Sequence, residues 1–171
     1  MKKAFTLIEL LIVIALLGAL AVGLLAALDP FEQLKKGTDT GVRNTVSEIH
    51  GAVIRFYAIK TQMPWTAVDP AVSSIPITQV SLGYSAIGIS NIITAGELKA
   101  DFSTLAGAQL KEISLAGTSD NVTVCFRPGS KAFRSDQNTK YNASFSDLGS
   151  NTVGNCGLPA AQTFSCYWCI K

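Results

Sequence analysis

Cys166 and Cys169, close to the end of the chain, have the C-x-x-C spacing of thiol pairs that carry out disulfide exchange. Such a pair is reactive when it lies at a helix N-terminus, where the helix dipole lowers the pKa of the first thiol. The surrounding residues, FSCYWCIK, are instead aromatic and typical of a strand. In a strand, side chains three residues apart point to opposite faces. We therefore expect each of these cysteines to bond elsewhere and not to catalyse redox chemistry.

Two further cysteines, Cys125 and Cys156, also lie in the last third of the chain, which predicts two disulfides if this part is exported to an oxidising environment. The favoured pairing is Cys156 with Cys166 and Cys125 with Cys169, because it ties a C-terminal strand to the preceding loop and to the neighbouring VTVCF strand. A zinc site is the alternative. The only histidine, His50, lies far upstream and is expected to be a solvent-exposed or packing residue of a helix.

Other patterns that carry chemistry are missing or weak in this sequence. It has no phosphate-binding GxxxxGK[ST] loop, no GxSxG, no HExxH and no acidic calcium loop. Asp120, Asp136 and Asp147 are scattered in expected loops and are interpreted as solvating charges, with a calcium site as the alternative. Asn121 and Asn142 begin glycosylation sequons that we expect to be unmodified. We expect no cofactor, no metal and no enzymatic activity.

Glu9 is the one charged residue in the apolar run AFTLIELLIVIALLGALAVGLLAAL, residues 4–28. At ~1.5 Å of rise per residue, a helix of this length spans a bilayer. Lys2 and Lys3 precede it and should stay on the cytoplasmic side. A cleaved secretory signal or a plain signal anchor is the alternative, but neither explains an ionisable group whose burial in lipid costs about 2.5–3.5 kcal/mol. Glu9 is therefore expected to have a function.

The N-terminal sequence KKAFTLIELLIVIALLG resembles the class III signal and helix start of type IV prepilins and of the related pseudopilins of type II secretion, over residues 2–25. The resemblance implies that a membrane peptidase cuts between Ala4 and Phe5 and methylates the new terminal phenylalanine. The family normally has glycine where Ala4 stands, and alanine is small enough for the same subsite. Glu9 matches the family's glutamate, and we expect it to neutralise the amino group freed at Phe5 of an adjacent subunit.

Gly18 matches a glycine at which the family's helix can loosen, and Gly23 adds a second weak point. The usual helix-kinking proline is missing at Ala26, and Pro30 comes one turn later. Pro30 cannot donate to the carbonyl of Ala26, and its ring crowds that turn. We therefore predict a kink or a loosened helix near residues 24–30.

Beyond Pro30 the apolar residues recur at intervals of three and four, which predicts an amphipathic helix running to about Lys60. The apolar positions are Phe31, Leu34, Val42, Val46, Ile49, Val53 and Phe56 or Tyr57. The charged residues, with Asp39 among them, are assigned to the opposite face. Met63-Pro64-Trp65 should end this helix, because proline bars its continuation.

The rest of the chain predicts a small antiparallel sheet with short accessory elements. Residues 65–90 are expected to form a long, partly ordered loop. A short helix should begin at the N-cap Thr94 and end at Leu105, with Leu98, Phe102 and Leu105 packed inward. Strands are predicted at 109–115, 121–127, 131–134 and 163–170, with an exposed loop at 135–154.

Length and composition limit the organisation of the chain. With 171 residues there is room for one head and one long extension. Only 15% of the residues are charged, against about 25% in soluble domains, so part of the chain should lie outside water. The predicted fold is α+β, a long helix packed on a small antiparallel sheet. Its predicted parts are a leader (1–4), a transmembrane or filament-core half-helix (5–28), an amphipathic half-helix (29–62) and a globular head (63–171).

The function that the resemblance implies is that of a structural subunit of an extracellular type IV pilus-like filament. The chain would be a single-pass protein of the cytoplasmic membrane before assembly. Its implied partners are its own copies in a helical homopolymer, a prepilin peptidase, an assembly platform and an assembly ATPase. Loss of Lys2 and Lys3 would leave twelve basic and twelve acidic side chains, so no specific nucleic acid is expected. A pseudopilin or minor pilin is one alternative, and a membrane-anchored extracytoplasmic binding or redox module is another.

Overall fold

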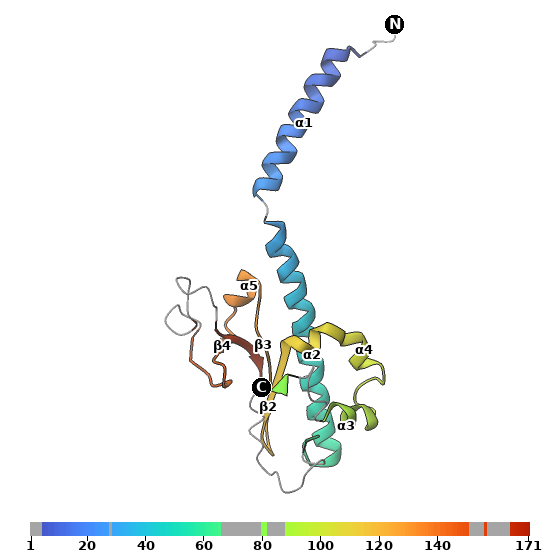
Figure 1. Cartoon of the computed structure of the whole chain (residues 1–171), viewed down its shortest axis with the longest axis vertical. Helices are drawn as coiled ribbons and strands as arrows, with labels where there is room; N and C mark the ends of the chain where they lie inside the picture. The colour runs from blue at the N-terminus through green and yellow to red at the C-terminus, as the bar shows by residue number, and fades with distance from the viewer. Residues whose placement is uncertain (1–4, 28, 66–79, 82–87, 151–155, 157–164) are drawn as a thin grey trace. The chain divides into compact units, whose positions relative to one another are not determined.

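A computed structural model of the chain describes residues 5–27, 29–65, 80–81, 88–150, 156 and 165–171 (Figure 1). It divides into two compact units, residues 1–34 and 35–171. The first unit consists mainly of helix α1, Leu7–Ala27, and the first turns of helix α2, Pro30–Lys60. The second unit contains the rest of α2 and the head.

Helix α1 is apolar around its whole circumference, with Glu9 as its only charged residue. Its side chains up to Leu25 are exposed within the isolated chain, and residues Leu7–Leu25 have a mean hydropathy of 2.8. By length and composition this helix can cross a membrane.

The helical path is interrupted between α1 and α2, within the region where the sequence predicts a kink. Asp29 is not helical, and Pro30 is the first residue of α2, a position where its missing N–H costs nothing. The Glu32 N–H donates to Oδ1 of Asp29 at 3.3 Å, so Asp29 caps the new helix. Pro30 thus begins a second helix and does not bend a continuous one.

Helix α2 is amphipathic, and it ends at Lys60 as the 3–4 spacing predicts. Its buried residues are Asp39, Val42, Val46, Ile49, Ala52, Val53 and Phe56. After the helix, Met63 and Trp65 turn into the core. A Cβ added to Gly117 would lie 2.5 Å from the Trp65 ring, so this glycine makes room for the indole.

Among the described residues the sheet has five antiparallel strands, in the order β1-β2-β3-β5-β4. The strands are β1 (Val80–Ser81), β2 (Ile113–Gly117), β3 (Val122–Phe126), β4 (Thr139–Tyr141) and β5 (Tyr167–Ile170). The last strand of the chain is therefore an inner strand, paired with β3 on one side and with β4 on the other. Side chains of α2 and of the sheet share one buried cluster, which includes Val46, Ile49, Val124 and Trp168. This arrangement confirms the predicted α+β fold of a helix on a small antiparallel sheet.

Short helices flank the sheet, and several differ from the predicted elements. They are α3 (Ile89–Thr94), α4 (Phe102–Ala106), the 3₁₀ helix η1 (Gly107–Glu112) and α5 (Lys131–Arg134). The predicted strand at 131–134 is wrong, because Ser130 caps a helical turn there by accepting a hydrogen bond from the Phe133 N–H. Of the strand predicted at 109–115, the first four residues belong to η1.

The predicted helix from Thr94 to Leu105 is wrong over residues 95–101, which are not helical, whereas residues 102–105 belong to α4. Thr94 ends α3, and Gly96, with φ 81°, stops that helix in the left-handed conformation that glycine favours. Leu98 and Phe102 are buried as predicted, but Leu105 is 73% exposed. The Glu97 carboxylate accepts from Nε of Arg55 at 2.8 Å and does not cap a helix.

The predicted exposed loop at 135–154 contains strand β4, whose residues Thr139 and Tyr141 are buried. The predicted strand 121–127 agrees with β3, and the predicted strand 163–170 is shorter, beginning at Tyr167. Most of the loop predicted at 65–90 lies outside the described residues, and its described part contains β1.

Candidate assembly site and its anchorage in the head

The N-terminal end of α1 is organised by Thr6 and Glu9. The N–H and the hydroxyl of Thr6 both donate to Oε2 of Glu9, at 2.8 and 2.7 Å. The Glu9 N–H lies 3.4 Å from the Thr6 hydroxyl and donates to it. This reciprocal pattern is a capping box, and it places the carboxylate at the positive end of the helix dipole.

Thr6 is a residue that the sequence analysis missed, although its T-x-x-E spacing before an apolar run is the signal for a capping box. Phe5 precedes it and is 79% exposed, while Ala4 lies outside the described residues. A cut between Ala4 and Phe5 would create an amino group one residue before the Thr6 N–H that Glu9 already accepts. The carboxylate is therefore well placed to meet a positive charge at this end of the helix.

Gly18 lies inside helix α1, whereas Pro30 is the first residue of helix α2. Helix α1 is continuous through Gly18, and a Cβ built there meets no described atom within 4 Å. Small size is thus not required at Gly18 within the isolated chain. Pro30 lies at the interruption between the two helices.

Asp39 anchors α2 to the head, where the sequence analysis had placed it on the exposed face. It is only 6% exposed. Its Oδ2 accepts from the N–H of Ser130 at 2.8 Å and from the Ser130 hydroxyl at 2.6 Å, and its Oδ1 accepts from the Gly129 N–H at 3.1 Å. Asp39 is the first buried residue of α2, so these bonds mark the point where the helix enters the head.

Replacing Asp39 with alanine should destabilise the head by about 1–3 kcal/mol, because three donors lose their acceptor in a buried place. Chemical denaturation of the full chain in detergent measures the change in the free energy of unfolding. Asp101→Ala is the matched control, because Asp101 is exposed and makes no side-chain cap bond. Equal stability of the two variants would show that the buried carboxylate does not hold α2.

Two disulfides join the four cysteines in the pairing that the sequence favours, Cys125 with Cys169 and Cys156 with Cys166. Cys125 and Cys169 are directly opposite each other on β3 and β5. Cys166 immediately precedes β5. Both bridges therefore hold the C-terminal strand in the middle of the sheet, and the C-x-x-C residues are not bonded to each other.

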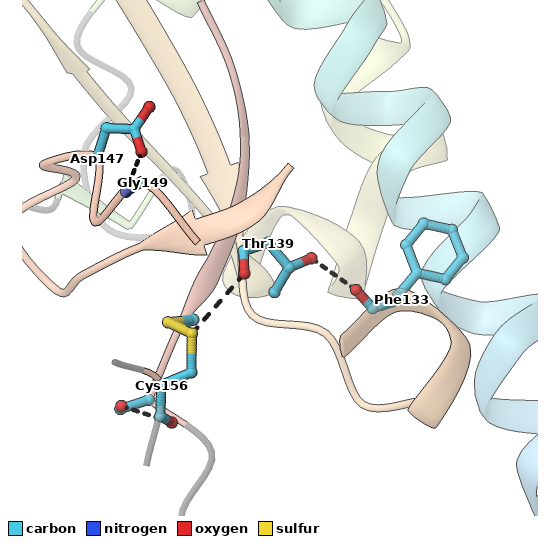
Figure 2. The surroundings of a disulfide bond; sticks show 7 residues. Phe133, Thr139, Asp147, Gly149 and Cys156 are labelled. Atoms are coloured by element: carbon cyan, nitrogen blue, oxygen red, sulfur yellow. Dashed lines mark hydrogen bonds between the residues drawn. A yellow bond between two sulfur atoms is a disulfide. The ribbon is translucent and has the colours of Figure 1, made fainter. Parts of the chain in front are cut away.

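Figure 2 shows the surroundings of the second bridge. The Cys156 sulfur lies 3.8 Å from the carbonyl oxygen of Thr139, and the Thr139 hydroxyl donates to the carbonyl of Phe133 at 2.6 Å. Both cysteines of this bridge are fully buried. The bridge thus packs against the β4 strand at the point where the chain returns from α5.

Two acidic side chains of the head, Asp136 and Asp147, have protein partners. The Lys140 ammonium and Oδ2 of Asp147 form an ion pair at 2.9 Å, and the Gly149 N–H donates to the same carboxylate (Figure 2). The hydrogen bond from Lys140, followed by that from Gly149, lowers the pKa of Asp147, and the pairing raises the pKa of Lys140. Asp136 accepts from the Trp168 indole N–H at 3.2 Å. Within the described residues no cluster of three candidate side chains could hold a metal ion.

His50 is half-buried on α2, beside a groove of about 320 Å³ that Asp120 and Lys171 also line. Its Nε2 is buried without a hydrogen-bond partner among the described residues. Burial lowers the pKa of His50 below its usual value, because the charged imidazolium is poorly solvated there. His50 is thus a packing residue, one of the two roles that the sequence predicts.

The lowered pKa of His50 makes the head less stable in mild acid. The unfolded chain takes up the proton more readily, so stability is present above about pH 6.5 and is lost as the pH falls through the pKa of the folded chain. His50→Leu should reduce the loss of unfolding free energy between about pH 7.5 and pH 5.5, measured by denaturant unfolding. Asp120→Asn is the control from the same groove. An unchanged pH dependence in His50→Leu would contradict this account.

Comparison with known protein families finds a match at the N-terminus of the chain. Residues 1–25 match the prokaryotic N-terminal methylation motif. The matched residues include the predicted cleavage position, the Thr6–Glu9 capping box and most of α1. No curated protein and no solved structure matches the chain.

Proposed function

We propose that this chain, a type IV pilin-like or pseudopilin protein by its N-terminal methylation motif, is the structural subunit of an extracellular filament whose core is built from α1. The observation that carries the proposal is the combination in residues 5–27 of an all-round apolar helix with a carboxylate held at its N-terminal end. An ionisable group in an apolar helix is costly for a simple membrane anchor, whereas in a helix that packs on copies of itself the carboxylate can also pair with the amino group of a neighbour.

The proposed sequence of events begins with insertion of residues 5–28 into the cytoplasmic membrane, with the basic leader 1–4 inside. Cleavage between Ala4 and Phe5 removes Lys2 and Lys3, which could not enter an apolar filament core. The new amino group of one subunit then meets Glu9 of its neighbour. Bringing the ammonium into the core without a counter-charge would be costly, so the pairing favours docked subunits.

The two parts of the extension have separate tasks in this proposal. The half-helix 5–28 is first covered by lipid and then by other copies. The half-helix 29–62 carries the head, residues 63–171, to which Asp39 fastens it. The chain itself acts as a structural component and not as an enzyme. Processing requires a prepilin peptidase, and extraction from the membrane requires an assembly platform and an ATPase.

The interruption at Asp29 and Pro30 supports assembly, because a joint between α1 and α2 lets the core helix be oriented separately from the head. Gly18 and Gly23 weaken α1 by about 1 kcal/mol each relative to alanine, so this helix can also extend locally when subunits dock.

Electron microscopy of surface fibres sheared from the producing cells, with identification of their subunit by mass spectrometry, tests the proposed function. Long filaments composed of this chain are expected. A chain that stays in the membrane fraction and forms no filaments would favour a membrane-anchored module.

A further inference from the structure

A groove of about 260 Å³ lies in the head beside residues Thr45 and Glu48 of α2. It is formed by α2 on one side and by α4 and η1 on the other, and it is lined by Thr45, Glu48, Lys99, Phe102, Leu105, Ala106 and Gln109. The Thr45 hydroxyl donates to Oε1 of Gln109 at 2.8 Å and so fixes the two sides together. Leu105 lies at the groove with 73% of its surface exposed, although it belongs to a helix whose Phe102 is buried.

The same chain presents a second exposed apolar surface on the first turns of α2. Phe31 is 73% exposed and Leu34 is 69% exposed. They are three residues apart and so lie on one side of the helix, and Lys35 lies about 40° from Phe31 on the side away from Leu34. They follow the membrane-compatible stretch Leu7–Leu25, so lipid hydrocarbon does not account for their apolar character.

We propose that the groove at Leu105 receives the first turns of α2 from a second copy of this chain, with Phe31 and Leu34 as the apolar anchors. This inference rests on the proposed filament, in which many copies are arranged along one axis. A helix laid in a groove and anchored by apolar residues at i and i+3 is a common mode of recognition, and here the exposed apolar residue of the mixed-polarity groove is Leu105. The groove carries one acidic residue, Glu48, and one basic residue, Lys99, and in the proposed contact Lys35, close to Phe31 on the helix, pairs with Glu48.

The contact fixes an axial offset between the two copies. Leu34 precedes Thr45 and Glu48 by 11 and 14 residues on the same helix. At ~1.5 Å of rise per residue, the second copy is therefore displaced by about 17–21 Å along the helix axis. Pairing of Glu9 with the Phe5 amino group needs only about 6 Å, four residues of helix. The two contacts thus involve different neighbours of one subunit.

Cysteine cross-linking within filaments tests this contact. Cells produce two chains together, one with Leu34→Cys and one with Leu105→Cys, and sheared filaments are analysed without reduction. Each chain carries one new cysteine, so any cross-linked dimer joins two copies. The control replaces Leu105→Cys with Ser103→Cys, an exposed position on the same helix about 200° away around its axis. The described native cysteines are all paired in disulfides.

A yield of dimer several-fold higher for the Leu34 and Leu105 pair than for the control pair supports the contact. Filaments with equal yields, or with no dimer, overturn it and leave the filament proposal in place. Absence of filaments from wild-type cells overturns the proposed function itself.

If the cysteine variants do not enter filaments, charge reversal provides a second test of the contact. Lys35→Glu and Glu48→Lys should each lower filament yield several-fold, and the double variant should restore it. Wild-type yield from the single reversals, or no restoration in the double variant, overturns the contact.

Discussion

Cells that produce Glu9→Leu should insert the chain into the membrane normally but form almost no filaments. The substitution makes α1 more apolar, and insertion scales assign a cost of about 2.5–3.5 kcal/mol to a charge in the middle of a membrane helix, so anchoring is preserved or improved. Docking suffers, because the amino group at Phe5 of the neighbour is positively charged at neutral pH and would be buried without a counter-charge. Quantifying the chain in the membrane and in sheared fibres separates the two effects.

Glu9→Gln is the informative control for this prediction. Glutamine has the shape and hydrogen-bonding groups of a protonated carboxyl, so it should assemble normally if Glu9 is simply neutral in the membrane. If the negative charge is required, the glutamine variant fails as the leucine variant does. Thr6→Ala removes the capping partner but keeps the carboxylate, and it should therefore retain most of the filament yield. Wild-type yield from Glu9→Leu would contradict the role assigned to Glu9.

Removing the Cys125–Cys169 disulfide should be the most damaging single change to the stability of the head. The bridge joins residues 44 apart, and the Cys156–Cys166 bridge joins residues 10 apart. The chain-entropy relation assigns about 4 kcal/mol to the first and about 3 kcal/mol to the second. The first bridge also holds β5 in register as an inner strand, so its loss affects the pairing with both β3 and β4.

Two double variants make this comparison, Cys125→Ala with Cys169→Ala and Cys156→Ala with Cys166→Ala. Denaturant unfolding of the oxidised full chains should rank both below the wild type, with the first variant the less stable. Peptide mapping without reduction checks the pairing in each. A first variant as stable as the wild type, or four free thiols in the exported wild-type chain, would contradict the stabilising role of the bridges.

The regular periodic parts of the fold could be predicted from the sequence. In both the apolar run of α1 and the 3–4 spacing of α2, a helix is the structure that pairs the backbone hydrogen-bonding groups and also places the apolar side chains together. The end of α2 at Lys60 followed in the same way from Pro64. The alternation in VTVCF likewise gave β3 within one residue at each end.

Where the sequence predictions were wrong, a local capping signal was interpreted in the wrong direction or overlooked. Thr94 and Gly96 were interpreted as the start of a helix, whereas Thr94 donates back to the Ser90 carbonyl at 2.7 Å and Gly96 ends α3. Ser130 is the N-cap of α5, and four residues between turns were too few to distinguish a helical turn from a strand.

Asp39 shows why the candidate site was only partly predictable. It lies three residues before Val42 and seven before Val46, which places it on the buried side of the helix. The sequence interpretation assigned Asp39 to the exposed face because of its charge and despite its position, since a carboxylate is rarely buried without a partner. Its partners, Gly129 and Ser130, are about 90 residues away along the chain, and only the tertiary fold brings them together.

The intact mass of the subunit in sheared filaments is the most direct test of the account. The predicted chain begins at Phe5, retains α1 and carries both disulfides, with a methyl group on its new amino terminus. That result would place α1 inside the filament with its amino group free of the basic leader. A filament subunit that still begins at Met1, or one cut after the apolar run near Leu28, would contradict the assembly mechanism.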